Sequence, residues 1–122
     1  MRSIALSALA VALTLAACAT TPRQQCEAPY RAELRNTTFH IRETEMLLRR
    51  GFGLVPARNE IGLHYCLRPT GSAYLCRAED GEPMFDRRPI NRVAEQAKLD
   101  ALRAEARRLT AAIADCQAAY PE

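Results

Sequence analysis

The sequence contains no tryptophan, and its aromatic side chains are limited to four tyrosines and three phenylalanines among 122 residues. Large aromatic side chains supply much of the buried area of most globular cores. Hydrophobic residues make up 48% of the chain, but many are alanines and many others lie in the first 17 residues. We therefore expect a thin, helical core rather than a globular one.

Groups that could carry catalysis are equally scarce. Beyond residue 18 the only serine is Ser72, which belongs to a turn sequence and lacks the Gly-x-Ser-x-Gly setting of a nucleophile. Neither a phosphate-binding loop nor a dinucleotide fingerprint occurs. His64, Cys66 and Cys76 lack the paired spacing of known zinc sites. The sequence therefore predicts no enzyme, no metal and no cofactor.

The N-terminus has the layout of a signal peptide. Arg2 supplies a positive charge, and residues 4–17 form a mostly apolar run without a charged residue. A helix needs ~20 apolar residues to cross a bilayer, so a permanent transmembrane helix is the weaker interpretation of this shorter run.

The apolar run ends in Leu15-Ala16-Ala17-Cys18, which resembles the lipobox of bacterial lipoproteins. The resemblance implies that residues 1–17 are removed and that Cys18 then carries diacylglycerol on its thiol, usually with a third acyl chain on its amine. Two acyl chains already anchor a protein stably. We expect a mature domain, residues 18–122, that is attached to a membrane through Cys18.

Four further cysteines, Cys26, Cys66, Cys76 and Cys116, form an even number in a short exported chain, which predicts two disulfides. Four cysteines allow three pairings. The neighbouring sequence patterns favour one of them.

Two stretches, residues 22–50 and 91–120, carry seam residues at alternating steps of three and four, as in a helical heptad. The seam residues are Tyr30, Leu34, Thr37, Ile41, Thr44 and Leu48 in the first stretch, and Leu99, Leu102, Ala106, Leu109, Ile113, Cys116 and Tyr120 in the second. An antiparallel pairing in which most facing residue numbers sum to 143 aligns the two seams. The same registry places Cys26 opposite Cys116 at the end nearest the anchor, so we expect a disulfide there.

The other two cysteines lie in strand-like runs, residues 61–67 and 73–77, on either side of a Pro-Thr-Gly-Ser turn. This predicts a β-hairpin closed by a Cys66–Cys76 disulfide, with Leu67 opposite Leu75. We expect residues 52–60 to be a connection, and residues 84–86 to add at most a short third strand.

The expected fold is therefore mainly α with a small β element. Residues 22–50 and 91–120 form an antiparallel two-helix hairpin, a coiled-coil-like stem, and residues 52–90 form a distal module that contains the disulfide-stapled β-hairpin. Thr21 begins a capping box, Gly51 follows two arginines as a helix stop, and Asn91 is a good cap for the second helix.

The distal module is rich in arginine. Residues 49–92 contain eight arginines against five acidic residues. The candidate partner-binding residues are Arg58, Arg68, Arg77, Arg87 and Arg88. Arginine suits carboxylates and phosphates, so the expected partner is an envelope protein or an anionic glycan. The alternative is that these arginines only keep the chain soluble.

The lipobox, the Arg49-Arg50-Gly51-Phe52 stop, the cysteine pattern and the closing residues 116–122 together resemble a family of small uncharacterised lipoproteins of Gram-negative bacteria. Some members carry the label of an ABC excinuclease component. Such a component needs a phosphate loop, so we expect no nucleotide hydrolysis and no nucleic-acid binding. Ala19 after the lipidated cysteine resembles lipoproteins sorted to the outer membrane. We expect the protein to be anchored on the periplasmic face of the outer membrane, with the inner membrane as the alternative location.

Two functions are compatible with these expectations. The first is a structural or protein-interaction role in the cell envelope. The second is an inhibitor or accessory subunit of an envelope enzyme or assembly machine that acts through the Cys66–Cys76 hairpin.

Overall fold

The structure is a computed structural model that describes residues 20–121. Its elements in chain order are α2 (Pro22–Arg50), β1 (Gly53–Pro56), β2 (His64–Leu67), β3 (Ala73–Cys76), the 3-10 helix η1 (Ala78–Asp80), β4 (Phe85–Arg88) and α3 (Arg92–Ala119). The prediction of a mainly helical fold with a small β element is confirmed. The predicted lipidation site, Cys18, lies outside the described residues.

Local hydrogen bonds set the ends of α2. At its start, Thr21 Oγ1 accepts from Gln24 N at 3.2 Å and Gln24 Oε1 accepts from Thr21 N at 3.0 Å, which forms a capping box. At its end, Gly51 adopts the left-handed conformation with φ 83°, and its N–H donates to Leu47 O. Each of these bonds joins residues no more than four positions apart, so neighbouring residues make the caps at both ends of α2.

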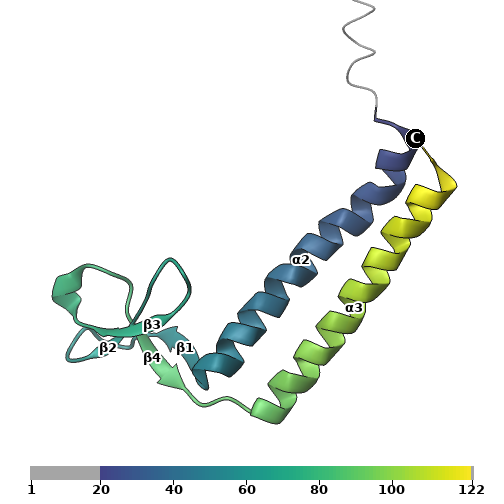
Figure 1. Ribbon diagram of the computed structural model, residues 1–122. Coiled ribbons are helices and arrows are strands. Elements are labelled where there is room, and N and C mark those ends of the chain that lie inside the picture. Colours follow the sequence, from purple (N-terminus) through teal and green to yellow (C-terminus); the bar gives the residue numbers. More distant parts are fainter. Residues whose placement is uncertain (1–19, 122) are drawn as a thin grey trace, which may run out of the picture.

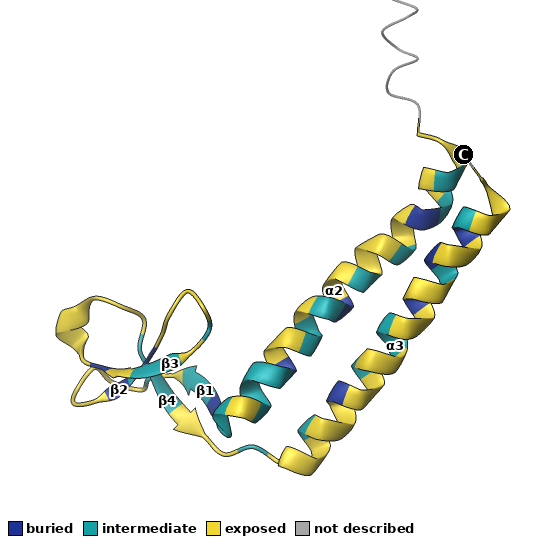
Figure 2. Cartoon of the chain, in the orientation of Figure 1, coloured by how far each residue is buried: buried dark blue, intermediate teal, exposed yellow. Residues whose placement is uncertain are grey.

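The two helices lie side by side and run in opposite directions (Figure 1). Buried residues lie on the sides of the helices that face each other (Figure 2). They are Glu27, Thr37 and Thr44 of α2, and Leu99, Leu109, Ile113 and Cys116 of α3. The hydroxyl of buried Thr44 donates to His40 O at 2.8 Å, so its burial leaves no unpaired donor. A single layer of mostly small and medium side chains therefore forms the helical core.

The β element is larger than the sequence predicts. It is a four-stranded antiparallel sheet with strand order β1-β4-β2-β3. The prediction that residues 52–60 form only a connection is wrong, because Gly53–Pro56 pairs with Phe85–Arg88. Gly53 and Pro56 both argue against a strand locally, and β1 exists only because β4, about 30 residues later, supplies its hydrogen-bonding partner.

The predicted register of the β2–β3 hairpin is wrong by two residues. Leu67 pairs with Ala73 and not with Leu75. The hydrogen bond from Arg68 N to Ser72 O, 2.9 Å, closes a three-residue loop, and that loop fixes the centre of the hairpin one residue earlier than expected.

The disulfide Cys66–Cys76 is consequently diagonal across the hairpin, with Cα atoms 5.8 Å apart. Both cysteines and His64 are buried on one side of the sheet, which we call the disulfide face. His64 Nδ1 lies 2.8 Å from Asp86 Oδ1, and His64 Nε2 lies 3.0 Å from Ile61 O. Through these two contacts His64 ties β2 to β4 and to the preceding loop.

The turn of this hairpin packs against the stem. Gly71 has φ 82°, and a Cβ added there would lie 2.5 Å from Met46 Sδ on α2. Figure 1 shows this turn beside the last turns of α2. The position therefore favours glycine both for its backbone conformation and for its contact with the helix.

Gly71→Ala is expected to lower the free energy of unfolding by about 1 kcal/mol through the left-handed backbone, and also to displace Met46. Gly62→Ala is the matched control, because Gly62 has φ 89° but no atom within 4 Å of an added Cβ. Urea unfolding of both variants, repeated with Met46→Ala, checks this. The excess cost of Gly71→Ala should disappear in the Met46→Ala background, and an unchanged excess would contradict the packing described here.

Candidate functional site

A hollow lies where the end of α2 meets the face of the sheet opposite the disulfide face. It is a cleft of about 620 Å³, which we call the distal cleft. Its lining residues are Met46, Arg49, Arg50, Phe52, Tyr65, Thr70, Gly71, Ser72 and Ala73. The helix end supplies the first three, the link between α2 and β1 supplies Phe52, and the sheet and the hairpin turn supply the others.

Aromatic and cationic side chains stack in and beside this cleft. The left-handed cap at Gly51 turns the chain so that the Phe52 ring lies 5.0 Å from the ring of Tyr65. The guanidinium of Arg50 lies 5.5 Å from the centroid of the Phe52 ring, and that of Arg87 lies 4.5 Å from it. These cation–π contacts fix the orientation of Phe52 and hold the sheet to the helix end.

The rim of the distal cleft is positively charged. Arg50 Nε donates to Phe52 O at 2.9 Å, and burial lowers the pKa of the Arg50 guanidinium, which nevertheless stays cationic at neutral pH. Arg49 is exposed beside it. No acidic residue is among those that line the cleft. An apolar aromatic floor with a cationic rim suits a ligand that has an apolar group next to a carboxylate or another anion.

The structure does not gather the five arginines that the sequence singles out. The guanidinium of Arg68 lies 4.7 Å from the Tyr74 ring centroid, and Arg87 stacks on Phe52. Arg58, Arg77 and Arg88 are exposed at separate places: a loop, the residue after β3, and the last residue of β4. None of the five lines the distal cleft.

Sequence reasoning missed Arg49 and Arg50 as site residues. On sequence grounds both are only cations that favour the C-terminus of a helix. The available signal was their position directly before Gly51 and Phe52, because a left-handed glycine between cationic and aromatic side chains brings the two kinds together.

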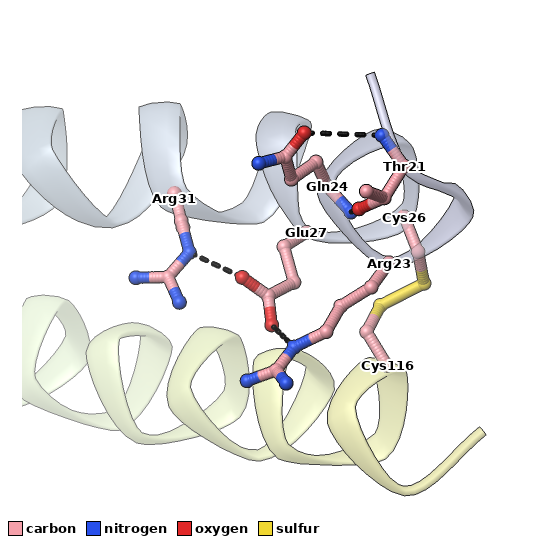
Figure 3. A network of polar contacts seen from close by, with 7 residues as sticks. All are labelled: Thr21, Arg23, Gln24, Cys26, Glu27, Arg31 and Cys116. Atoms are coloured by element: carbon pink, nitrogen blue, oxygen red, sulfur yellow. Dashed lines mark hydrogen bonds and ion pairs between the residues drawn. A yellow bond between two sulfur atoms is a disulfide. The ribbon is translucent and has the colours of Figure 1, made fainter. Parts of the chain in front are cut away.

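A second polar cluster lies at the opposite end of the stem (Figure 3). The buried Glu27 accepts from Arg23 Nε at 3.0 Å and from Arg31 Nε at 2.6 Å. Next to it, Cys26 is bonded to Cys116, with Cα atoms 5.8 Å apart. Both oxygens of the Glu27 carboxylate already accept from arginine side chains of the same helix. This cluster therefore fits a structural role at the helix ends better than a binding role.

The stability of the stem is expected to fall in acid through Glu27. The hydrogen bonds from Arg31 and then Arg23 hold the pKa of this carboxyl below its ordinary value of 4.5. A lowered pKa in the folded state means that the stabilisation is complete above pH 4.5 and is lost as the pH falls through the lowered value. Thermal unfolding between pH 7 and pH 2 should show this loss for the natural protein and a flatter profile for Glu27→Gln. Equal slopes for both proteins would contradict the assignment.

Within residues 20–121, no group of three or more histidine, cysteine, aspartate or glutamate side chains is placed to hold a metal ion. No helix in that part of the chain is long and apolar enough to cross a membrane. No protein-family model, curated protein or solved structure matches the chain.

Proposed function

We propose that this protein is a lipid-anchored periplasmic lipoprotein, attached through Cys18, with a structural or protein-interaction role in the cell envelope. In this proposal α2 and α3 form a coiled-coil-like stem stapled by the Cys26–Cys116 disulfide, and the sheet is the part that meets a partner. One observation carries the proposal: the sheet lies at the far end of the helix pair from the start of α2, which is the end nearest the predicted anchor (Figure 1).

The length of the helices supports this role. A helix of 29 residues, as α2 is, spans about 43 Å at a rise of ~1.5 Å per residue. A protein anchored by a residue just before α2 would present its sheet tens of ångströms from that anchor. The Cys26–Cys116 bond, next to the predicted anchor, would keep the two helix ends together where the chain enters the membrane surface.

The geometry favours an interaction role over the inhibitor role. An inhibitory loop needs to project so that it can enter the groove of another protein. Here the hairpin turn is seated against α2, since Gly71 lies directly beside Met46. The distal cleft between that turn and the helix is concave, so it receives a group from a partner rather than supplying one.

The anchor is tested by Cys18→Ser. We expect this variant to lose incorporation of radiolabelled palmitate and to remain uncleaved or to be released from the membrane fraction, because the acylated thiol is absent. Cys26→Ser is the matched control and should label normally. Normal palmitate labelling of Cys18→Ser would contradict the lipoprotein assignment.

The interaction role is tested with a photo-crosslinking amino acid placed at single positions in living cells. We expect protein adducts from the exposed distal positions Arg49 and Leu75, and few or none from the exposed stem positions Ala32 and Ala104. Immunoblots of ultraviolet-treated and untreated cells provide the measurement. Adducts confined to the stem, or none at any of the four positions, would contradict a partner-binding tip.

A further inference from the structure

One edge of the sheet is open. The strand order places β1 and β3 at the two edges. The edge strand β1 contains Pro56, a residue that blocks pairing with further strands, whereas β3 has the sequence Ala-Tyr-Leu-Cys and contains no proline or charged residue. The edge of β3 therefore lacks the usual protection against strand addition.

Two residues of β3 direct their backbone groups outward. Because Arg68 N donates to Ser72 O, the alternation of an antiparallel ladder makes Cys66 and Tyr74 a hydrogen-bonded pair. The intervening residues Ala73 and Leu75 then turn their N–H and C=O groups away from β2. No backbone group within residues 20–121 bonds to them.

We propose that the outer edge of β3 binds an extended acidic peptide segment of a partner protein, which adds to the sheet as a fifth strand and places an apolar side chain in the distal cleft. This inference rests on the proposed interaction role and names the binding mode and the chemistry of the partner.

The alternation of side chains aligns such a strand with the cleft. A residue that pairs with Ala73 places its side chain on the same face of the sheet as Ala73, and Ala73 lines the distal cleft. A residue two positions along pairs with Leu75, whose side chain is 58% exposed. Leu67, 40% exposed, lies on the same face. An added strand with apolar residues at every second position would cover these leucines and fill the cleft.

The positive charge around the edge of β3 favours an acidic segment over a second copy of this chain as the occupant. Arg49 and Arg50 line the cleft, and Arg77 directly follows β3. The region from residue 49 to residue 92 holds eight arginines against five acidic residues, so two copies joined edge to edge would bring like charges together. Because side chains alternate, glutamates that flank the two apolar positions on the same face of the added strand, opposite Gly71 and opposite Arg77, would face the cleft arginines at one end and Arg77 at the other.

The proposal is tested with a fluorescent seven-residue peptide that carries valine or phenylalanine at positions 3 and 5, glutamate at positions 1 and 7 and serine at the even positions, added to the full-length protein in neutral detergent micelles. We expect saturable binding in anisotropy titrations and no binding of the lysine counterpart. Two further peptides carry N-methyl groups on alternate amides. Methylation of the set that faces β3 should weaken binding by more than about tenfold, while methylation of the other set should leave it unchanged.

Protein variants locate the site without touching the sheet ladder. Arg49→Glu should weaken binding roughly fivefold, and Arg88→Glu, a matched exposed arginine outside the cleft, should change it little. In amide-resolved NMR spectra, the N–H groups of Ala73 and Leu75 should become protected from exchange when the acidic peptide binds.

Several results would overturn this inference. Equal binding of the two N-methylated peptides would exclude strand addition, and equal effects of Arg49→Glu and Arg88→Glu would exclude the cleft. Absence of peptide binding would also overturn it. If the peptide did not bind but the protein self-associated with rising concentration and protected Ala73, the occupant of the edge would be another copy of the chain. If distal crosslinks still formed in cells, the interaction role would stand and only this binding mode would fail.

Discussion

Replacing Cys26 and Cys116 together by alanine is expected to lower the free energy of unfolding by about 4–5 kcal/mol. The two cysteines are 90 residues apart in sequence, and a cross-link over so long a loop removes much of the conformational entropy of the unfolded chain. The thin helical core offers little else to offset this loss. Urea unfolding monitored by circular dichroism at 222 nm provides the measurement.

The second disulfide serves as the internal comparison. Cys66 and Cys76 are only 10 residues apart, so the same entropy argument gives a smaller loss of about 3 kcal/mol for their double alanine variant. That loss should be confined to the sheet, because both cysteines are buried there, and the helical signal should remain. A larger loss of helix stability from the Cys66/Cys76 variant than from the Cys26/Cys116 variant would contradict the proposed roles of the two bonds.

Leu109→Asp is expected to destabilise the helix pair by about 4 kcal/mol or more. Leu109 has no exposed surface and is one of the four buried residues of α3. The substitution removes a fully buried apolar side chain and places a carboxylate in a buried layer between the helices. Thermal and urea unfolding followed by circular dichroism measure the change.

A graded series tests whether the buried side of the stem is assigned correctly. Leu34→Asp, at a half-buried position of α2, should cost about 2 kcal/mol, and Arg35→Asp, at the exposed neighbouring position, should change stability by less than about 0.5 kcal/mol. Equal sensitivity at all three positions would mean that the contact between the helices is not where the burial pattern places it, and the stem would lose its physical basis.

The stability of the helix pair also bears on the proposed function, because the pair is cross-linked at one end and carries the sheet at the other. The hydrogen bond from Arg92 Nη1 to Leu48 O, 3.0 Å, ties the start of α3 to the end of α2 next to the sheet. Arg50 and Arg87 hold Phe52 between the helix and the sheet. The distal cleft therefore depends on the stem for one of its walls, and variants that loosen the stem should also weaken binding at the tip.

The sequence by itself determined the features that depend on neighbouring residues. Thr21, Gly51 and Asn91 mark the helix ends because a cap is satisfied within about four residues of the chain. The spacing of the seam residues marks the buried side of each helix, since helical periodicity repeats every turn. The Cys26–Cys116 pairing followed from the same spacing, because a helix is rigid enough to carry position over many residues, whereas the Cys66–Cys76 pairing followed from the two strand-like runs beside a Pro-Thr-Gly-Ser turn.

Only the tertiary structure decided the features that join distant segments. The strand β1 is four residues long and begins with glycine and ends with proline, so its own sequence gives only a weak strand signal, and its pairing with β4 supplies the stabilisation. The hairpin register depends on which residue lies at the centre of the three-residue loop. An error of one residue at that centre shifts the predicted pairing of the two strands by two residues. The distal cleft has no sequence signature, because its lining residues lie in three segments between residues 46 and 73 that meet only when the hairpin turn packs on α2. Local hydrogen bonds and helical periodicity can be predicted from the sequence alone. Strand partners and concave surfaces cannot, because they need contacts between distant segments, and the chain entropy lost in forming those contacts is offset only when the whole fold is complete.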